Sequence, residues 1–273
     1  SSDLAVRKIA GALAAGCSII IKGPEDTPAS VVELVRCFVD AGLPAGVLNL
    51  VFGRPAEVSG HLIPSPVIRK VSFTGSVPVG KQLAAMAGLH MKRVTMELGG
   101  HAPFIVFSDA DVESAANVAF ALKHRNAGQV CAAPSRFYLH ESIHDQFVDA
   151  FVKKSKSLKL GSGMSKDTQM GPLAMHKRVE AMQRFTDDAK SLGARVLTGG
   201  ERLGSSGNFF HPTTLVDVSE NALVSFEEPF GPIAPMYRFK TFDEVVSRAN
   251  ALPFGLSGFV FTKSLKTSID ISN

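Results

Sequence analysis

Cys131 is the residue in this sequence best placed to act as a nucleophile. It lies in a segment of small residues between an expected helix and an expected strand, and functional residues are more frequent in such loops than inside helices or strands. A catalytic thiolate needs solvent access and a neighbouring group that lowers its pKa. A loop cysteine taken alone is more often structural than catalytic, so Cys131 by itself leaves both interpretations open.

Glu97 ends an expected strand at 93–97, and Gly99 and Gly100 follow it. A carboxylate at the carboxyl end of a strand in an α/β sheet lies where such folds bind ligands, and the glycines allow a close approach. On its own, this side chain could equally be solvated. A second acidic segment, Glu227-Glu228-Pro229-Phe230-Gly231-Pro232, joins two carboxylates to an aromatic ring, and could also be no more than a rigid surface turn.

Residues 75–82 match the first part of the nucleotide-binding pattern GxxxxGK. The match fails because Gln82 stands where a Mg²⁺-binding hydroxyl is needed, and because Pro78 removes one of the backbone N–H groups that cradle phosphate. A P-loop NTPase is therefore not expected. Gly75 and Ser76 still lie at a strand-to-helix turn that suits a pyrophosphate, although they could simply cap the helix.

A cysteine hydrolase is the alternative that these residues leave open, because such an enzyme needs an imidazole beside its thiolate. His124 and His144 lie at a suitable distance along the chain, without a recognisable flanking motif. The other cysteines, Cys17 and Cys37, fall on apolar faces of an expected strand and helix, so we expect them in the core. The three cysteines form no CxxC pair, and no metal site is expected.

Short apolar strands alternate along the chain with amphipathic helices, which predicts an α/β fold with parallel strands. Before residue 98, we expect strands at 18–21, 47–52, 69–73 and 93–97 and helices at 4–15, 28–41, 56–62 and 77–87. Beyond it, we expect strands at 104–107, 136–140, 194–197, 210–218, 234–239 and 258–261 and helices at 111–124, 144–158, 175–192, 242–250 and from 264 onward. A boundary near Leu98 therefore divides the chain into two domains.

The composition is that of a folded globular protein. Of 273 residues, 45% are hydrophobic and 20% are charged, and no apolar run is long enough to cross a bilayer. The net charge of +4 is spread along the chain, so neither nucleic acid nor a membrane is an expected partner. Few cysteines and no visible signal peptide favour a reducing, cytoplasmic compartment.

Five short segments, in order and in register, resemble the NAD(P)-dependent aldehyde dehydrogenase superfamily. They are Lys22-Gly23-Pro24-Glu25 with Thr27-Pro28, Phe73-Thr74-Gly75-Ser76, Glu97-Leu98-Gly99-Gly100, Gly128-Gln129-Val130-Cys131 and Glu228-Pro229-Phe230-Gly231-Pro232. Glu97 precedes Cys131 by 34 positions, as the family pattern expects, and the resemblance covers essentially the whole chain. It favours the functional interpretation of each segment over the structural one.

The resemblance implies an aldehyde dehydrogenase-like α/β fold. Residues 1–98 would form the later part of a dinucleotide-binding domain with a Rossmann-like parallel sheet, and residues 99–273 would form the catalytic domain. Cys131 resembles the nucleophile that adds to the aldehyde, and Glu97 resembles the general base that activates water to hydrolyse the resulting thioester. The positions that resemble cofactor-binding residues are Lys22 and Glu25 at the adenosine ribose, Gly75 and Ser76 at the pyrophosphate, and Glu228 and Phe230 at the nicotinamide ribose and ring.

Two residues bear on the choice of cofactor and substrate. A carboxylate at Glu25 would repel a 2′-phosphate, so NAD is expected over NADP. Arg125 lies six residues before Cys131, and this segment resembles the succinate-semialdehyde dehydrogenase branch. The Arg125 guanidinium could clamp a substrate carboxylate, or it could simply end the preceding helix, where a cation suits the helix dipole.

The family pattern also continues on both sides of this chain. An asparagine in a Pro-Trp-Asn segment, which supplies a second oxyanion donor, and a β-arm that builds dimers and tetramers have no counterpart here, and the chain has no Trp. The chain is therefore expected to be a central fragment of a homo-oligomeric enzyme that acts on a small aldehyde. Alone it could be catalytically silent, and this alternative stands beside the enzyme.

Overall fold

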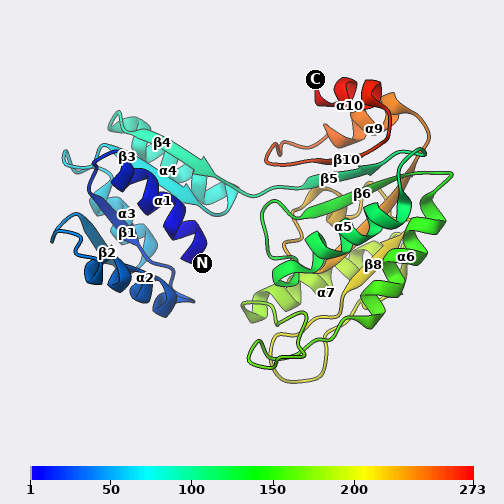
Figure 1. Cartoon of the computed structure of the whole chain (residues 1–273), viewed down its shortest axis with the longest axis horizontal. Helices are drawn as coiled ribbons and strands as arrows, with labels where there is room; N and C mark the ends of the chain where they lie inside the picture. The colour runs from blue at the N-terminus through cyan, green and yellow to red at the C-terminus, as the bar shows by residue number, and fades with distance from the viewer. Residues whose placement is uncertain (1) are drawn as a thin grey trace. The chain divides into compact units, whose positions relative to one another are not determined.

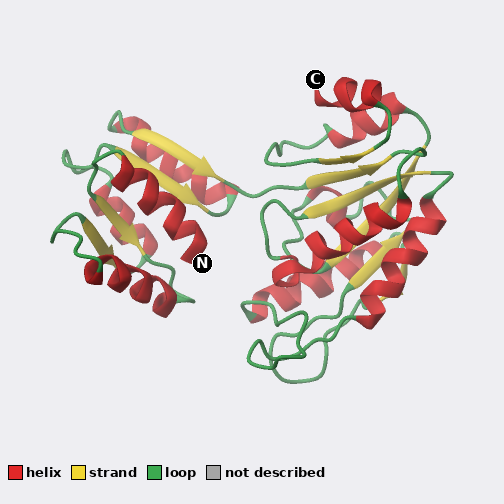
Figure 2. Cartoon of the chain, viewed as in Figure 1, coloured by secondary structure: helices red, strands yellow, loops and turns green. Residues whose placement is uncertain are grey.

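The computed structural model describes residues 2–273, which form two compact units. Unit 1 ends at Leu98 and unit 2 begins at Gly99. Figure 1 follows the chain through both units, and Figure 2 separates their helices from their strands. Helices and strands alternate in each unit, and most neighbouring strands are parallel. The α/β class predicted from the sequence is confirmed.

Unit 1 holds two parallel strand pairs and the helices between the strands. Its elements are α1 (Ser2–Ala14), β1 (Ile19–Lys22), α2 (Pro28–Asp40), β2 (Leu48–Val51), α3 (Pro55–Leu62), β3 (Lys70–Thr74), α4 (Val77–Leu89) and β4 (Arg93–Glu97). β1 pairs with β2, and β3 pairs with β4. Ile9 of α1, Ile21 of β1 and Val31 of α2 are buried together. Pro28 starts α2 because its fixed φ and missing N–H suit the first helical turn.

Unit 2 is built on a six-stranded sheet in the order β10-β5-β6-β9-β8-β7. In chain order, its elements are β5 (Ala102–Val106), α5 (Val112–His124), the 3₁₀ turn η1 (Arg125–Gly128), β6 (Pro134–His140), α6 (His144–Ser157), α7 (His176–Ser191), β7 (Arg195–Thr198), β8 (Thr213–Val216), α8 (Leu223–Phe226), β9 (Ile233–Phe239), α9 (Phe242–Ala249), β10 (Phe259–Phe261) and α10 (Leu265–Ser272). β7 is antiparallel to β8, and the other strand pairs of this sheet are parallel.

The sheet of unit 2 is covered on both faces. Phe104 and Val106 of β5 pack into one cluster with residues of α5 and α6, whereas Ile105 packs into a second cluster with residues of α7 and α9. This alternation is what a strand buried on both faces requires. At the start of α5, the Asp111 carboxylate accepts a hydrogen bond from Ser114 N at 3.0 Å and caps the helix. The opposite end of α5 leads directly into the segment that contains Cys131.

Three elements of unit 2, β7, β8 and α8, differ from the sequence-based expectation. β7 and β8 are antiparallel because the link between them contains no helix, and parallel neighbours need a long crossover. The strand expected at 210–218 is also shorter and spans only Thr213–Val216. α8 was not predicted, since its four residues are too few to show a helical period.

Cys17 and Cys37 are exposed, so the prediction that both are buried was wrong. Cys17 belongs to the turn before β1, because the strand begins two residues later than Cys17. On α2 the apolar face is made by Val31, Leu34 and Phe38, whose spacing of three and four residues leaves Cys37 on another face. Because Cys17 and Cys37 are accessible to solvent, an alkylating reagent is expected to reach them as well as Cys131.

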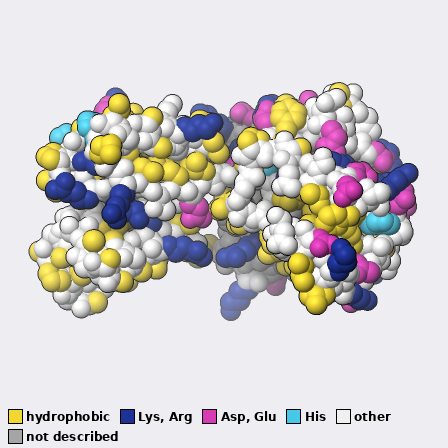
Figure 3. All heavy atoms as spheres, turned by 90° about the horizontal axis from the view of Figure 1, so that it is seen from above, with side chains coloured by type: hydrophobic (Ala, Val, Ile, Leu, Met, Phe, Trp, Pro, Cys, Tyr) yellow, Lys and Arg dark blue, Asp and Glu magenta, His cyan; other side chains and the backbone are white. Residues whose placement is uncertain are grey.

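The surface carries both charged and hydrophobic side chains. On the face shown in Figure 3, side chains of both charges are dispersed over unit 2. In unit 1, several large hydrophobic residues such as Leu89 and Met91 are exposed. Among the helices of residues 2–273, none is long and apolar enough to cross a membrane.

Candidate active site

The loop that carries Cys131, residues 125–131, has an unusual backbone and is called the cysteine loop below. Asn126, Ala127 and Gly128 adopt φ values of 52°, 54° and 73°, so three successive residues are left-handed. Glycine adopts this conformation freely and asparagine tolerates it, but it strains alanine. Such strain persists only where the surroundings hold it, and it is concentrated at functional sites.

Gln129 supplies much of what holds this backbone. Its Nε2 donates to the Asn126 carbonyl at 3.0 Å, and Asn126 Nδ2 donates back to the Gln129 carbonyl at 3.1 Å. Gln129 Oε1 also accepts from Ala174 N at 2.9 Å, which ties the loop to the segment before α7. Cys131 follows two residues later and is half-buried. A Cβ built on Gly100 would lie 2.6 Å from the Cys131 carbonyl, so only glycine allows this close approach.

Residues 227–232, called the acidic loop below, pack directly against the cysteine loop. A Cβ on Gly128 would overlap the carbonyl of Gly231, so the two backbones touch at a pair of glycines. Arg178 of α7 holds the acidic loop from another direction. Its Nη2 donates to the carbonyls of Pro229 and, at 3.3 Å, of Phe230, and its guanidinium lies 5.9 Å from the centre of the Phe230 ring.

Glu228 occupies the space that Gly99 and Gly100 leave open. Its Oε1 accepts a hydrogen bond from Gly100 N at 3.2 Å, and a Cβ on Gly99 would overlap the Glu228 carboxylate. Burial raises the pKa of Glu228, while the Gly100 N–H and the charges of Arg178 and Lys123 lower it. Unit 2 therefore brings together Cys131, Glu228 and Phe230 on two loops that touch.

Arg125 is exposed and forms the cap at the carboxyl end of α5. From there the chain turns into the cysteine loop. This position suits a cation at the negative end of the helix dipole and also leaves the guanidinium accessible to a ligand. The geometry is compatible with both roles that the sequence left open.

Glu97, Gly75 and Ser76 lie at the same edge of unit 1. Glu97 ends β4 opposite Thr74 of β3, and Gly75 N donates to the Glu97 carbonyl at 3.1 Å. Ser76 then occupies the N-cap position of α4 without a capping hydrogen bond from its side chain, and it is exposed at the first turn of the helix. The half-buried Glu97 also has a charged neighbour that sequence reasoning missed: Lys8 of α1, whose pKa is lowered by burial and raised by the Glu97 carboxylate.

Lys22 and Glu25 form an ion pair at the carboxyl end of β1. The Lys22 side chain is 26% exposed and that of Glu25 is 55% exposed, so both remain accessible at the edge of the strand pair. An ammonium beside a carboxylate offers a donor and acceptors to the hydroxyl groups of a ribose. Together with the glycine turn before α4, these residues fit the adenosine half of a dinucleotide.

The two histidines considered for a hydrolase are side chains of the core. His124 packs against Phe120 and Phe151, at ring-centre distances of 4.8 and 5.5 Å, and burial lowers its pKa to about 4. His144 is 3% exposed, and its Nδ1 bonds Asp145 at 2.9 Å. Both histidine side chains are thus buried.

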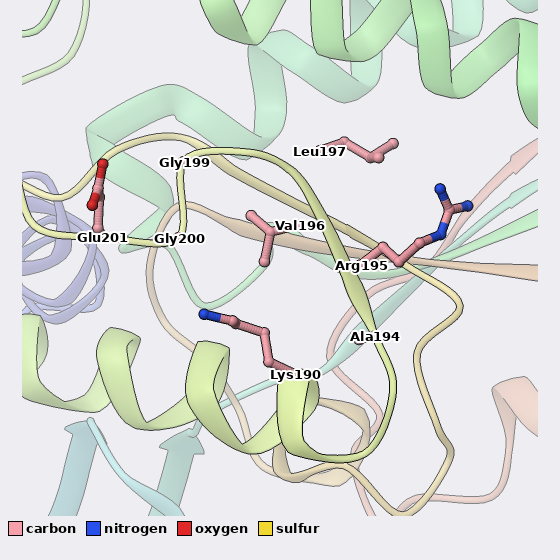
Figure 4. Close-up of a pocket in the computed structure, with 8 residues that line it drawn as sticks. All are labelled: Lys190, Ala194, Arg195, Val196, Leu197, Gly199, Gly200 and Glu201. Carbon is pink, nitrogen blue, oxygen red and sulfur yellow. The ribbon is translucent and has the colours of Figure 1, made fainter.

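A surface depression lies at the outer edge of the sheet, between the end of α7 and β7. Figure 4 shows the Lys190 side chain extending from α7 toward the turn at Gly200. Neither the cysteine loop nor the acidic loop lines this depression. The residues of unit 2 that the sequence singled out therefore lie away from this depression.

Comparison with known proteins decides the family. Residues 2–273 match the aldehyde dehydrogenase family. The chain belongs to this family. It is 48% identical over 269 residues to a 4-(hydroxymethyl)benzenesulfonate dehydrogenase of Comamonas testosteroni, covering 98% of this chain and 56% of that protein. It is 43% identical over 259 residues to the NADP(+) succinate-semialdehyde dehydrogenase GabD of Escherichia coli, covering 95% and 54%.

A solved aldehyde dehydrogenase of Bacillus cereus, an NAD+ complex, superimposes with a TM-score of 0.95 at 39% identity, covering 99% of this chain and 55% of that one. The chain thus spans about half the length of the relatives it matches. The fold and the family membership follow from these matches. The name of the Escherichia coli relative contains NADP(+), whereas the Bacillus cereus structure is an NAD+ complex.

Proposed function

We propose that the whole protein oxidises an aldehyde to the corresponding acid with NAD, through a covalent intermediate on Cys131. The observation that carries this proposal is the conformation of the cysteine loop. Gln129 holds a strained backbone in place two residues before the half-buried Cys131. Membership of the aldehyde dehydrogenase family supports it. Glu97 is proposed as the general base of the same reaction.

Cys131 and Glu97 have separate roles in the proposed reaction. The Cys131 thiolate adds to the aldehyde carbon, and the Cys131 backbone N–H donates to the oxyanion of the resulting thiohemiacetal. Departure of hydride from that carbon leaves a thioester. Glu97 then takes a proton from water as the water attacks the thioester carbon, and the carbon–sulfur bond breaks to release the acid and restore the thiolate.

When bound, the dinucleotide supplies the hydride acceptor. The residues proposed to hold it are Lys22, Glu25, Gly75, Ser76, Glu228 and Phe230. Their chemistry fits this role, since the set combines a helix N-terminus for phosphate with carboxylates and an ammonium for hydroxyl groups.

NADH formation, followed by its absorbance with a panel of aldehydes, tests the proposal on the whole protein. We expect acid formation to require the dinucleotide and to match NADH mole for mole. Hydrolytic turnover with no need for a dinucleotide would favour the cysteine hydrolase instead. The same assay on the 273-residue chain alone decides whether this part is catalytically silent.

We expect the enzyme to prefer NAD to NADP by at least about 10-fold in kcat/KM, because the exposed Glu25 carboxylate repels a 2′-phosphate. In E25S, the preference should narrow or reverse. Steady-state kinetics with both cofactors measures this, and D26S is the matched control, since Asp26 is an exposed acid in the same loop. Equal efficiency with NAD and NADP in the unmodified enzyme would show that Glu25 does not discriminate.

The substrate is proposed to be a short aldehyde that carries a carboxylate, such as succinate semialdehyde. Arg125 supports this choice, because it is exposed at the start of the cysteine loop and a guanidinium binds a carboxylate through two parallel hydrogen bonds. Two relatives carry names that contain an anionic substrate group, a sulfonate in one and a succinate in the other. A guanidinium pairs with either anion.

Replacing Arg125 with alanine should lower kcat/KM for succinate semialdehyde by about 10- to 150-fold, mainly through KM, because a charge-assisted pair is lost. An uncharged aldehyde of equal length should be nearly unaffected. R195A is the control, since Arg195 pairs with Asp217 near the far edge of the sheet. Equal losses for both aldehydes would assign Arg125 to the end of α5 alone.

A further inference from the structure

Lys123 is a buried cation for which the proposed reaction has no role. It lies in the last turn of α5, two residues before the cysteine loop begins, and it is 1% exposed. Lysine is almost never fully buried unless a partner compensates its charge. Burial lowers the pKa of the Lys123 ammonium to about 7, and the carboxylate of Glu228 acts in the opposite direction.

A cavity of about 10 Å³ joins Lys123 to Glu228. Its lining also includes Gly100, Gly128, Ser135 and Phe230. The cavity therefore adjoins the point where the cysteine and acidic loops touch. It is at the lower limit of the space that one water molecule needs, and it is far too small for an aldehyde or a nucleotide. The cavity is therefore not a ligand site. It separates the Lys123 and Glu228 side chains, which interact electrostatically.

We propose that Lys123 is a positioning residue that acts through Glu228: from behind the acidic loop, its buried ammonium keeps the Glu228 carboxylate ionised and oriented to accept hydrogen bonds from the nicotinamide ribose. This inference rests on the proposed function, in which Glu228 binds that ribose. Glu228 is half-buried, and burial alone would favour its protonated form, which accepts fewer hydrogen bonds. A cation behind the loop opposes this protonation.

The other charged groups around the pair do not titrate in the range where Glu228 does. Arg178 of α7 faces Glu228 and stays charged. Burial is the main cause that lowers the pKa of His101 to about 3 and that of His124 to about 4. The nearby charge of Lys123 contributes to both shifts. Both imidazoles are therefore neutral above about pH 5, and Glu228 and Lys123 account for the pH response from there to neutrality.

The test measures the dissociation constant of NADH by its fluorescence, from about pH 5 to about pH 8, for the whole protein and for K123M, E228Q and the double variant. In the unmodified protein, affinity should fall as the pH drops through the titration of Glu228. In K123M, that midpoint should move upward by up to about 1 pH unit, since a nearby cation is lost. In the E228Q background, K123M should change affinity by no more than about twofold, the scatter expected for independent sites.

Two variants control for packing. K123R keeps the positive charge and should return the midpoint to that of the unmodified protein, whereas K123Q should shift it as K123M does. K190M removes an exposed lysine at the edge of the sheet and should leave the whole profile unchanged. A uniform loss of affinity in K123M with an unmoved midpoint would make Lys123 merely structural and would overturn the proposal.

Thermal unfolding without cofactor gives a second readout. The pKa of Lys123 is lower in the folded protein than in the unfolded chain, so the unfolded chain binds more protons between the two values. The Tm of the unmodified protein should therefore rise relative to K123M as the pH increases above about 7. In the E228Q background this rise should begin at lower pH, because Lys123 has lost its counter-charge.

The two readouts separate the possible failures. If NADH binds but neither readout shows coupling between Lys123 and Glu228, this proposal is wrong and the proposed function stands. If the unfolding data show coupling but no NADH binds, the ribose role of Glu228 is wrong, and the proposal fails together with the proposed function.

Discussion

Cys131→Ala is expected to lower the dehydrogenase activity of the whole protein by about 10³-fold or more, while NADH still binds. Without the thiolate no thiohemiacetal forms, and the acid cannot be made by this route. The side chain is half-buried, and its removal leaves the backbone contacts of Asn126, Gln129 and Gly100 in place. The loss should therefore appear in kcat and not in the affinity for the dinucleotide.

The exposed cysteines provide the control for this experiment. C17A and C37A remove thiols from unit 1, and both should retain full activity. Loss of activity in either variant, or substantial NADH formation by C131A, would remove Cys131 from the mechanism. An ester substrate added to C131A also tests whether any hydrolytic side activity depends on the same sulfur.

Glu97→Gln should lower the steady-state rate by about 10²- to 10⁴-fold, the range for loss of a general base. In the proposed reaction, hydride transfer precedes the step that needs this base, so rapid mixing should show a burst of NADH equal to the enzyme concentration, followed by a slow phase. Glutamine keeps the shape of the side chain, and the Gly75 N–H bond to the Glu97 carbonyl is unaffected. E57Q, a change at an exposed acid on α3, is the control.

A burst that disappears together with the steady-state rate would place Glu97 before hydride transfer. An unchanged steady-state rate would exclude it from catalysis altogether. The amplitude of the burst thus reports on hydride transfer, and the slow rate reports on thioester hydrolysis. Only a full burst followed by a slow steady state supports a role for Glu97 in thioester hydrolysis.

Much of the secondary structure could be predicted because local patterns determine it. β4 has the bounds 93–97 that the sequence indicated, since Glu97 is followed by a leucine and two glycines that cannot extend the strand usefully. α2 starts at Pro28 for an equally local reason. Errors arose where a boundary was displaced by one or two residues, as at Cys17, or where a helical face was misassigned, as at Cys37.

The contacts between loops could not be predicted from local patterns. The left-handed backbone of Ala127 has no signature in the sequence, because it is imposed by the hydrogen bonds of Gln129 and by a loop about 100 positions later. The burial of Lys123 contradicts the usual preference of lysine for solvent, and the Glu228 carboxylate, distant in the sequence, opposes the effect of burial on the Lys123 pKa. Arg178 was likewise missed, since its partners are backbone carbonyls.

The backbone contact between Gly128 and Gly231 limits how this protein can diversify. A side chain at Gly128 would displace the Gly231 carbonyl, and the space beside Gly231 is itself filled by Met182. A side chain at Gly128 would therefore require a backbone shift, whereas one at Gly231 would require the Met182 side chain to move. Arg125, exposed at the loop entrance, can change alone. Under the proposed function, a change of substrate preference is therefore expected to involve Arg125 before Gly128.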